Sequence, residues 1–290
     1  MNAHTATFKS GASKRRSGAT EHSEIFARNI RDIALRMVAQ ANASHIGSAL
    51  SIADIVAVLY SGALNFDPVA PADPARDRFI LSKGHACVAV YAALAQARFF
   101  SHDLLASYGS DWSPLMAHIN HHVPGVEFST GALGHGLPFG VGKALAAKRK
   151  GASWRTVVLM SDGECGEGSN WEATLFAAHH RLDRLTAIID YNKLQSLGTV
   201  ADTLGLEPLG AKFAAFGWAV REVDGHDHAA LSDALADRVW QPGQPQLLLA
   251  HTIKGKGVPF MEGKVEWHYR SPGPDDLAQA LTAIWGTAHA

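Results

Sequence analysis

One stretch, from Met160 to Asn192, constrains the fold of this chain more than any other. An apolar, β-branched run leads into an acidic turn rich in glycine, a helical pattern follows, and a second apolar run ends at Asp190. This order predicts a βαβ unit with Asp162 after its first strand and Asn192 after its second. Ligands bind at the carboxyl ends of parallel strands, and two oxygen ligands beside a helix N-terminus suit a divalent cation that holds a phosphate group.

Segments with strand and helix patterns alternate along the rest of the chain. Strands are predicted at 78–81, 156–160, 185–189, 218–223 and 246–251. Helices are predicted at 24–41, 51–64, 86–98, 170–181, 209–216, 228–240 and 278–285, with a polar loop at 41–47 and another helix that ends at Lys150. The alternation predicts an α/β fold with a mostly parallel sheet and helices on both faces. No linker is visible, so we expect one domain over residues 21–290 after a disordered tail at residues 1–20.

Composition narrows the class of protein. The formal net charge of -1 gives no reason to expect nucleic acid or a membrane surface as a partner. No apolar run approaches the ~20 residues that a membrane span needs. Two cysteines, Cys87 and Cys165, do not make a disulfide framework, so a reducing, cytoplasmic location is expected. The first 20 residues carry basic but no acidic side chains, which leaves an organelle transit peptide as the alternative to a disordered tail.

Common phosphate and metal motifs fail on their spacing. Phe139 breaks the glycine pattern of a dinucleotide-binding turn, and Glu167 occupies the position that an EF-hand reserves for glycine. A zinc site at His118, His121 and His122 would lack a nearby cysteine or other fourth ligand. The acidic turn therefore needs another explanation.

The central stretch resembles the thiamine-diphosphate motif, in which Gly-Asp-Gly is followed by a distant Asn. Here Ser161-Asp162-Gly163 is followed by Asn192, 30 positions after the aspartate. From about residue 25 to 272, the chain resembles the N-terminal half of transketolase, in landmarks that occur in the same order. These landmarks are Ser44–Gly47, Leu81–Ala86, Pro124–Gly134, Asp190–Gln195, Asp224–Asp227 and Thr252–Gly257. The resemblance implies the thiamine-diphosphate-binding fold, as the diphosphate-binding domain.

The cofactors that this resemblance implies are thiamine diphosphate and Mg²⁺, for which Ca²⁺ or Mn²⁺ could substitute. The Asp162 carboxylate, the Asn192 amide oxygen and the Leu194 carbonyl would bind the metal, because Mg²⁺ prefers hard oxygen ligands in octahedral geometry. Diphosphate oxygens and a water would complete the set, and Gly163 would let the backbone approach the diphosphate. The alternative is that Asp162 only caps a helix.

Further contacts with the cofactor are implied by the same landmarks. They involve His85, Gly131, Ala132, Leu133 and Glu167. Glu167 belongs, by resemblance, to a carboxylate network across a subunit interface, with Glu164 as the weaker candidate. Taken alone, Glu167 would be an exposed acid that the helix dipole favours.

Histidines are implied as catalytic groups. Ketol transfer removes a proton from a donor hydroxyl, breaks a carbon–carbon bond and returns a proton, for which groups with a pKa near neutrality are suited. His45, His118 and His268 match these positions, with His121 as the second choice after His118. For each of them the alternative is an ordinary surface or core histidine. The segment 116–122 does not align cleanly with the family's motif, so the sugar that is used stays open.

No residue of the chain matches the pyrimidine-binding domain of transketolase, which supplies the glutamate that activates the cofactor. We therefore expect the N-terminal subunit of a split transketolase, which transfers a two-carbon ketol unit from a ketose phosphate to an aldose phosphate. A separate C-terminal subunit would supply the other half of the site, and two copies of each would form a heterotetramer. One alternative is the α subunit of a 2-oxo acid dehydrogenase, a family that lacks the pattern at 252–257 and His268. Another is a non-catalytic subunit that binds the cofactor or serves assembly.

Overall fold

A parallel sheet of five strands forms the centre of the protein, in a computed structural model that describes residues 9–286. The strands lie in the order β1-β2-β3-β5-β4, and every neighbouring pair is parallel. Their bounds are Arg78–Leu81 (β1), Thr156–Ser161 (β2), Leu185–Tyr191 (β3), Ala219–Asp224 (β4) and Gln246–His251 (β5). The predicted α/β fold with a parallel sheet is therefore confirmed.

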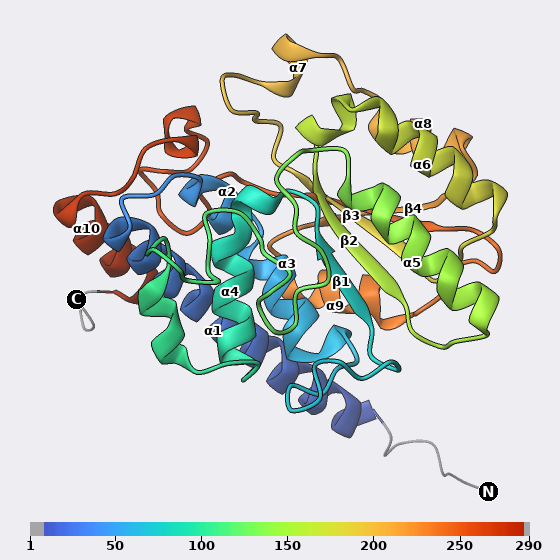
Figure 1. Cartoon of the computed structure of the whole chain (residues 1–290), viewed down its shortest axis with the longest axis horizontal. Helices are drawn as coiled ribbons and strands as arrows, with labels where there is room; N and C mark the ends of the chain where they lie inside the picture. Colours follow the sequence, from blue (N-terminus) through green and yellow to red (C-terminus); the bar gives the residue numbers. More distant parts are fainter. Residues whose placement is uncertain (1–8, 287–290) are drawn as a thin grey trace, which may run out of the picture.

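Helices cover both faces of this sheet (Figure 1). The core on the first face is shared with α1 (Lys9–Gln40), α2 (Ile46–Ser51), α3 (Ala53–Val58), α4 (Cys87–Gln96), α9 (His228–Ala236) and α10 (Pro274–Trp285). The core on the second face is shared with α5 (Gly136–Lys150), α6 (Gly168–His179) and α8 (Leu209–Ala215), while α7 (Val200–Thr203) lies between β3 and α8. Within residues 9–286, none of these helices is long and apolar enough to cross a membrane.

The two cores follow from the alternation of side chains along each strand. Phe79 and Leu81 of β1 are buried in the core of the first face, whereas Ile80 between them is buried in the core of the second. Successive side chains of a strand point to opposite faces, so a strand buried on both faces is apolar throughout. On the second face, Gly140 of α5 allows close packing, because a Cβ there would lie 2.4 Å from the Val158 side chain.

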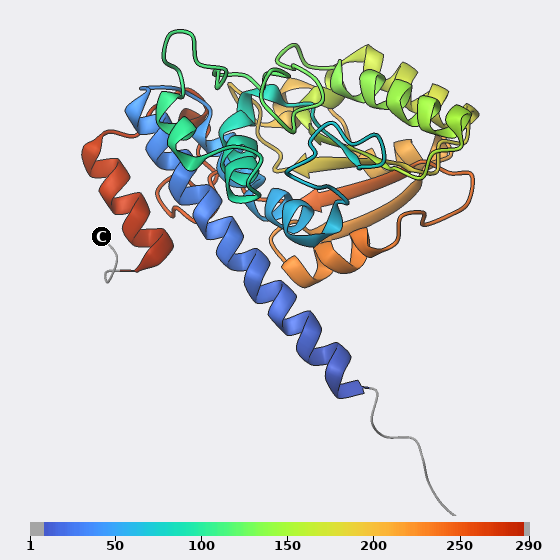
Figure 2. The same cartoon turned by 60° about the horizontal axis from the view of Figure 1, so that its bottom comes forward.

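Helix α1 is longer than the sequence pattern indicated. It begins at Lys9, so residues 9–20, which we expected to be disordered, are helical; residues 1–8 of the expected tail lie outside the described residues. No proline precedes Pro68, so nothing breaks the helix in the region where apolar periodicity is lost. The N-terminal part of α1 extends away from the helices that pack around its C-terminal part (Figure 2).

The region between α1 and β1 also differs from the prediction. The expected polar loop at 41–47 is shorter, since α2 already begins at Ile46, and the expected helix at 51–64 is broken. The break falls at Ile52, whose backbone dihedrals (φ -99°, ψ 1°) are not helical. Ser51, which we expected to cap a helix, instead donates its hydroxyl to Asp190 over 2.6 Å. A partner 139 residues away is invisible to a local sequence pattern.

Two helix ends in the last third of the chain differ from the prediction. Helix α9 ends at Ala236 rather than at 240, and Arg238 just beyond it forms an ion pair with the buried Asp77. Helix α10 begins at Pro274 rather than at 278. Proline suits the first turn of a helix, and the Asp276 carboxylate accepts a hydrogen bond from Gly273 N at 3.1 Å.

Candidate active site

A pocket of about 270 Å³ opens at the carboxyl ends of the strands. It receives residues from the segments that follow β1, β2, β3 and β5, from the start of α2 and from the loops at 118–133 and 265–269. Its lining is His45, Ser48, Lys83, His85, His118, Gly131, Leu133, Ser161, Asp162, Gly163, Asn192, Leu194, Gln195, Ser196, Lys254, His268 and Tyr269. Ten of the twelve residues that the sequence assigned to a site are among them.

The histidines predicted for the site gather in this pocket. The ring of His45 lies 5.1 Å from that of His85, 5.7 Å from that of His118 and 5.0 Å from that of His268, between centroids. His121 does not line the pocket; its Nδ1 lies 2.7 Å from the Ser129 hydroxyl. The geometry therefore favours His118 over His121 as the histidine of that loop which faces a ligand.

The backbone holds His45 in an unusual conformation. His45 precedes α2 with φ 75° and ψ 14°, a left-handed conformation that few residues other than glycine adopt. Its N–H donates to the carbonyl of His268 over 2.7 Å, which ties the start of α2 to the loop after β5. Strained backbone of this kind concentrates at functional sites, because the surrounding structure must maintain it.

Two imidazoles in the pocket, those of His45 and His268, are held in their neutral form. Burial, followed by the charges of His118, Lys254 and Lys83, lowers the pKa of His45 to about 4. Burial, followed by Lys254, lowers the pKa of His268 to about 3. At neutral pH each ring carries one N–H and one unprotonated nitrogen. In His268 the unprotonated nitrogen is Nδ1, which lies 3.0 Å from the donor Lys254 Nζ, so its Nε2–H is left to donate to a substrate. The ring of His45 can give or accept a proton at a substrate hydroxyl.

We expect the lowered pKa of His45 to make its contribution to stability depend on pH. In the unfolded chain His45 binds a proton below about pH 6.5, whereas the folded chain resists this until about pH 4. Its stabilising contribution is therefore fully present above pH 6.5 and is lost as the pH falls from there toward 4. Urea denaturation of the cofactor-free wild type and of cofactor-free His45→Asn measures this contribution. The difference between their free energies of unfolding should be smaller at pH 5 than at pH 7.5.

The comparison with His45→Asn is needed because other groups titrate in the opposite sense. Burial, followed by Asp190, raises the pKa of Asp162 to about 7, so protonation of Asp162 favours the folded chain at low pH. Asp162 titrates in both proteins, so its contribution cancels when the free energy of unfolding of His45→Asn is subtracted from that of the wild type. A stability difference between the two proteins that stays constant from pH 7.5 to pH 5 would contradict a lowered pKa at His45.

Asp162 joins the ends of two neighbouring strands. It is 1% exposed; its Oδ1 accepts a hydrogen bond from Gly163 N at 2.7 Å, and its Oδ2 accepts one from Lys193 N. The first bond is the capping contact that we weighed as an alternative role for Asp162. The raised pKa of Asp162 shows that these two bonds do not compensate for burial beside Asp190, whereas a nearby cation would favour the carboxylate.

Asn192 is oriented by the buried carboxylate of Asp190. Asn192 Nδ2 donates to Asp190 Oδ2 over 2.9 Å and to the Ser51 hydroxyl over 3.2 Å. This assignment of the amide leaves Oδ1 on the opposite side, where it accepts from Leu194 N at 3.0 Å and keeps a second lone pair. Asp190 also accepts from Lys83 Nζ at 2.5 Å. Burial raises the pKa of Asp190, but the charge and hydrogen bond of Lys83, together with the hydroxyls of Ser51 and Thr252, hold it below its usual value.

The oxygens at this corner suit a hard divalent cation. The Asp162 carboxylate, the Asn192 amide oxygen and the Leu194 carbonyl belong to residues that line one pocket, and Mg²⁺ prefers such a set of oxygens. Among residues 9–286, no three His, Cys, Asp or Glu side chains are arranged to hold a metal ion. A metal here would thus depend on the amide and the carbonyl together with the oxygens of a ligand. The backbone is also crowded here, since a Cβ at Gly163 would lie 2.9 Å from Gln195 Cγ.

Two buried lysines of the pocket, Lys83 and Lys254, were not predicted from the sequence as site residues. Both lie within landmarks that were recognised, immediately before Gly84-His85 and after Thr252-Ile253. Lys254 Nζ donates to the carbonyl of Gln195 over 2.9 Å and lies 3.0 Å from His268 Nδ1. Burial, followed by the charge of Lys83, lowers the pKa of Lys254 to about 8. Two buried cations make the pocket favourable for an anion such as a diphosphate.

Two assigned residues, Ala132 and Glu167, do not line the pocket. Both are exposed, and Glu167 lies at the start of α6 beside Gly134. Glu164, the weaker candidate, is fully buried and accepts hydrogen bonds from the Ser82 hydroxyl, from Gly134 N and from the backbone N–H of β2's last residue. Glu164 therefore fixes the loop that carries Gly131 and Leu133 to the ends of β1 and β2.

Comparisons with known proteins agree with this arrangement. The family described as the thiamine diphosphate binding domain of transketolase matches residues 22–289. The chain is 44% identical over 241 residues to an apulose-4-phosphate transketolase subunit of Actinobacillus succinogenes, a match that covers 83% of this chain and 87% of that protein. It is 39% identical over 240 residues to the 6-deoxy-6-sulfo-D-fructose transketolase subunit SqwG of Clostridium sp., covering 82% of this chain and 87% of that protein.

Solved structures of transketolases share the fold. The transketolase from Leishmania mexicana superposes with a TM-score of 0.84 at 31% identity, over 90% of this chain and 41% of that one. The transketolase from Campylobacter jejuni superposes with a TM-score of 0.85 at 29% identity, over 92% of this chain and 43% of that one. The chain thus spans about two fifths of the length of these transketolases. By the extent of these matches, the chain belongs to the transketolase family and corresponds to its thiamine diphosphate binding domain.

Proposed function

We propose that this chain is the N-terminal subunit of a split transketolase that uses thiamine diphosphate and Mg²⁺. It transfers a two-carbon ketol unit from a ketose phosphate to an aldose phosphate. The observation that carries this proposal is the shared pocket, whose lining contains both the oxygens of Asp162, Asn192 and Leu194 and a cluster of histidines. The oxygens suit a metal-bound diphosphate, and the histidines suit a hydroxylated sugar.

Different residues of this chain would bind the metal and neutralise the charge of the diphosphate. Asp162, Asn192 and the Leu194 carbonyl hold the metal, while Lys83 and Lys254 offset the negative charge of the diphosphate. Bound thiamine diphosphate supplies the reactive carbon that carries the two-carbon unit. The protein contributes the position of that group and a pocket in which water is partly excluded.

Three histidines are proposed to move protons at the sugar. His45 has an unprotonated ring nitrogen at neutral pH because its pKa is lowered, so it can accept a proton from a donor hydroxyl. His268 is also neutral, but its Nδ1 faces Lys254 Nζ, so its Nε2–H is proposed to donate to a substrate oxygen. His118 is exposed at the mouth of the pocket, where an incoming sugar would meet it first. His85 lies deeper, beside Lys83, and is proposed as a contact of the cofactor together with Gly131, Ala132, Leu133 and Gly163.

A separate partner subunit is proposed to complete the site. Support comes from relatives of similar length that are themselves named as transketolase subunits, such as those of Actinobacillus succinogenes and Phocaeicola vulgatus. A C-terminal, pyrimidine-binding subunit would supply the other half, in a heterotetramer with two copies of each, in the cytoplasm. Helix α6 offers a surface for such a partner, since Leu175 and Phe176 are 59% and 43% exposed and Glu167 lies at its start.

The test is ketol transfer by the purified chain alone and after it is mixed with its C-terminal transketolase subunit. We expect negligible turnover by the chain alone and thiamine-diphosphate-dependent turnover of xylulose 5-phosphate by the mixture. Apulose 4-phosphate and 6-deoxy-6-sulfofructose belong in the substrate panel, because relatives are named for these sugars.

Each alternative predicts a different result in this assay. Substantial turnover by the chain alone would contradict the split enzyme. Oxidative decarboxylation of pyruvate by the mixture, without ketol transfer, would favour a 2-oxo acid dehydrogenase. A mixture that remains fully active when the chain carries Asp162→Ala would favour a non-catalytic role.

A further inference from the structure

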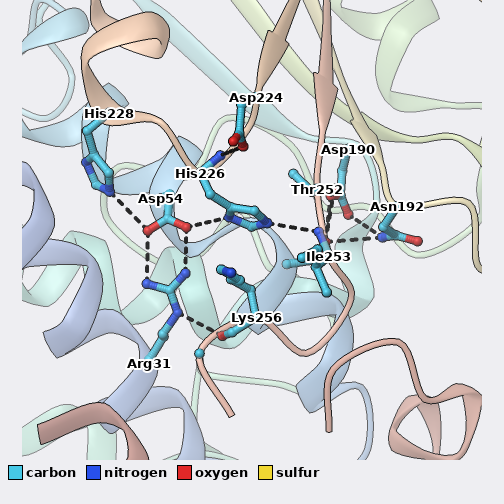
Figure 3. A network of polar contacts seen from close by, with 12 residues as sticks. Arg31, Asp54, Asp190, Asn192, Asp224, His226, His228, Thr252, Ile253 and Lys256 are labelled. Carbon is cyan, nitrogen blue, oxygen red and sulfur yellow. Dashed lines mark hydrogen bonds and ion pairs between the residues drawn. The ribbon is translucent and has the colours of Figure 1, made fainter. Parts of the chain in front are cut away.

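A buried polar cluster lies outside the pocket, around the carboxylate of Asp54 (Figure 3). Asp54 in α3 is 4% exposed and accepts two hydrogen bonds from the guanidinium of Arg31 in α1, at 2.9 and 2.6 Å. His226, in the turn after β4, and His228, at the start of α9, contact the same carboxylate at 2.6 and 3.0 Å. Burial raises the pKa of Asp54, but Arg31 and the two histidines outweigh it and hold the pKa well below its usual value.

The hydrogen bonds define the tautomer of His226. Its Nε2 lies 2.8 Å from the backbone N–H of Ile253, which can only donate, so Nε2 is the acceptor. The proton of the neutral ring is therefore on Nδ1 and is donated to Asp54 Oδ2. The backbone of His226 is itself held, because its N–H donates to Asp224 Oδ1 over 2.8 Å. His226 thus links a fixed carboxylate to one backbone amide in the loop after β5.

That amide lies between a residue that supports the pocket, Thr252, and one that lines it, Lys254. Thr252 donates its hydroxyl to Asp190, the carboxylate that also orients Asn192, and Lys254 lines the pocket directly. The Ile253 side chain is 39% exposed, so its burial does little to fix the segment. Further along the segment, Gly255 N donates to Gly47 O over 2.9 Å. At Ile253 itself, the acceptor of the backbone N–H is the imidazole of His226.

We propose that His226 is a positioning residue of the candidate active site: it accepts the Ile253 N–H and so holds Thr252 against Asp190 and Lys254 in the pocket. It touches neither cofactor nor substrate, and acts through the backbone. The inference rests on the proposed function, since it takes the pocket as the site of thiamine diphosphate. Arg31 supports the same loop further along, because its Nε donates to the carbonyl of Lys256 over 2.9 Å.

Two amide substitutions separate this role from a purely structural one. In His226→Gln the amide oxygen can reach the position of Nε2 and accept from Ile253 N, while the donor to Asp54 is lost. In His226→Asn the amide nitrogen can replace Nδ1 as the donor to Asp54, while the acceptor for Ile253 N is lost. If His226 acts through Ile253, Gln rescues the function and Asn does not. If His226 only stabilises the Asp54 cluster, the order is reversed.

The first readout is hydrogen exchange of the segment 252–257 in the cofactor-free full chain. We expect slow exchange in the wild type and in His226→Gln, and faster exchange in His226→Asn. His228→Asn is the matched control, because His228 contacts Asp54 and Ser23 but not the loop after β5. This control should unfold at lower denaturant concentration and leave the exchange of 252–257 close to that of the wild type.

The second readout is thiamine diphosphate titration of the chain with its partner subunit. For His226→Asn we expect the half-saturating concentration of the cofactor to rise by roughly 10-fold, the factor that corresponds to the loss of one hydrogen bond. The kcat at saturating cofactor should change far less. His226→Gln keeps this bond and should stay within about 3-fold of the wild type. Equal effects of Asn and Gln, or a larger effect of Gln, would overturn the proposal.

The two readouts also distinguish failure of this inference from failure of the proposed function. Exchange at 252–257 needs no cofactor, so it tests the bond between His226 and Ile253 by itself. A wild-type complex that binds no thiamine diphosphate would overturn the proposed function and, with it, the role of His226 at that site. Normal cofactor binding with unchanged exchange and titration in His226→Asn would overturn the positioning role alone.

Discussion

Replacing Asp162 by alanine should weaken magnesium-dependent binding of thiamine diphosphate by at least about 100-fold, the upper end of what loss of an outer-shell metal partner costs. Asp162 is the one carboxylate among the three proposed protein ligands, and a divalent cation loses most of its attraction to the site without it. Ketol transfer by the complex should fall in parallel, because the proposed metal would anchor the diphosphate. Calorimetric titration of the complex with the cofactor at saturating Mg²⁺ measures the effect.

The variant Asp162→Asn separates a metal ligand from a helix cap. Asparagine is among the best capping residues, so it can still accept from Gly163 N. If Asp162 only caps the turn that follows it, Asp162→Asn will bind the cofactor normally, which would contradict the proposed metal site. If its charge is needed, this variant will fail almost as badly as alanine.

The same variant has two opposing effects on the cofactor-free chain. Burial and the nearby Asp190 disfavour the Asp162 carboxylate, which is why its pKa is raised to about 7, and a neutral amide removes this cost above pH 7. The amide oxygen can accept from Gly163 N, but the amide nitrogen then faces the Lys193 N–H, which loses its acceptor. We therefore expect the free energy of unfolding in urea to change by less than about 2 kcal/mol, so that loss of binding is not a consequence of unfolding.

Replacing Lys83 by methionine should destabilise the fold by about 3–5 kcal/mol, the usual cost of leaving a buried charge without its partner. The Lys83 and Asp190 side chains are 1% and 0% exposed, and Nζ lies 2.5 Å from Oδ2. The hydroxyls of Ser51 and Thr252 and the amide of Asn192 would still donate to Asp190, but none of them carries a charge. Urea denaturation of the cofactor-free chain gives the loss directly.

A double variant and a surface control define the origin of this loss. Lys83→Met with Asp190→Asn removes the unpaired charge and should recover part of the stability that Lys83→Met loses. Lys143 also pairs with a carboxylate, Glu127, at 3.7 Å, but its side chain is 36% exposed. Lys143→Met should cost less than about 1 kcal/mol. Equal losses for the two lysines would contradict the importance of burial at Lys83.

The strands were predictable because their signal is local. Fully buried parallel strands are continuous apolar runs, and β5 occupies the predicted residues 246–251 without a shift. The break between α2 and α3 was not predictable, because the apolar pattern continues across it; Ser51 beside it bonds to Asp190, 139 residues away. Likewise, the first turns of α1 have no apolar face, so periodicity could not reveal them.

Most residues that line the candidate site were predicted from the sequence, but its two buried lysines were not. Asp162, Asn192 and the histidines stood in sequence landmarks, and the structure brings them together in one pocket. The burial of Lys83 and Lys254 depends on how four strand ends converge around Asp190, which no single landmark contains. The exposure of Ala132 and the burial of Glu164 rather than Glu167 are set by the same three-dimensional packing.

The parts of the pocket differ in how strongly the surrounding structure constrains them, and this determines where substitutions can accumulate. Its floor consists of side chains such as Lys83 and Asp162, each 1% exposed and bonded to several strand ends, so a change there disturbs the whole domain. Its mouth is the loop around His118, which is exposed and lies between helices. Loops on a rigid scaffold accept substitutions readily. Selection for a new sugar can therefore act on residues 116–122 while the cofactor site is inherited unchanged.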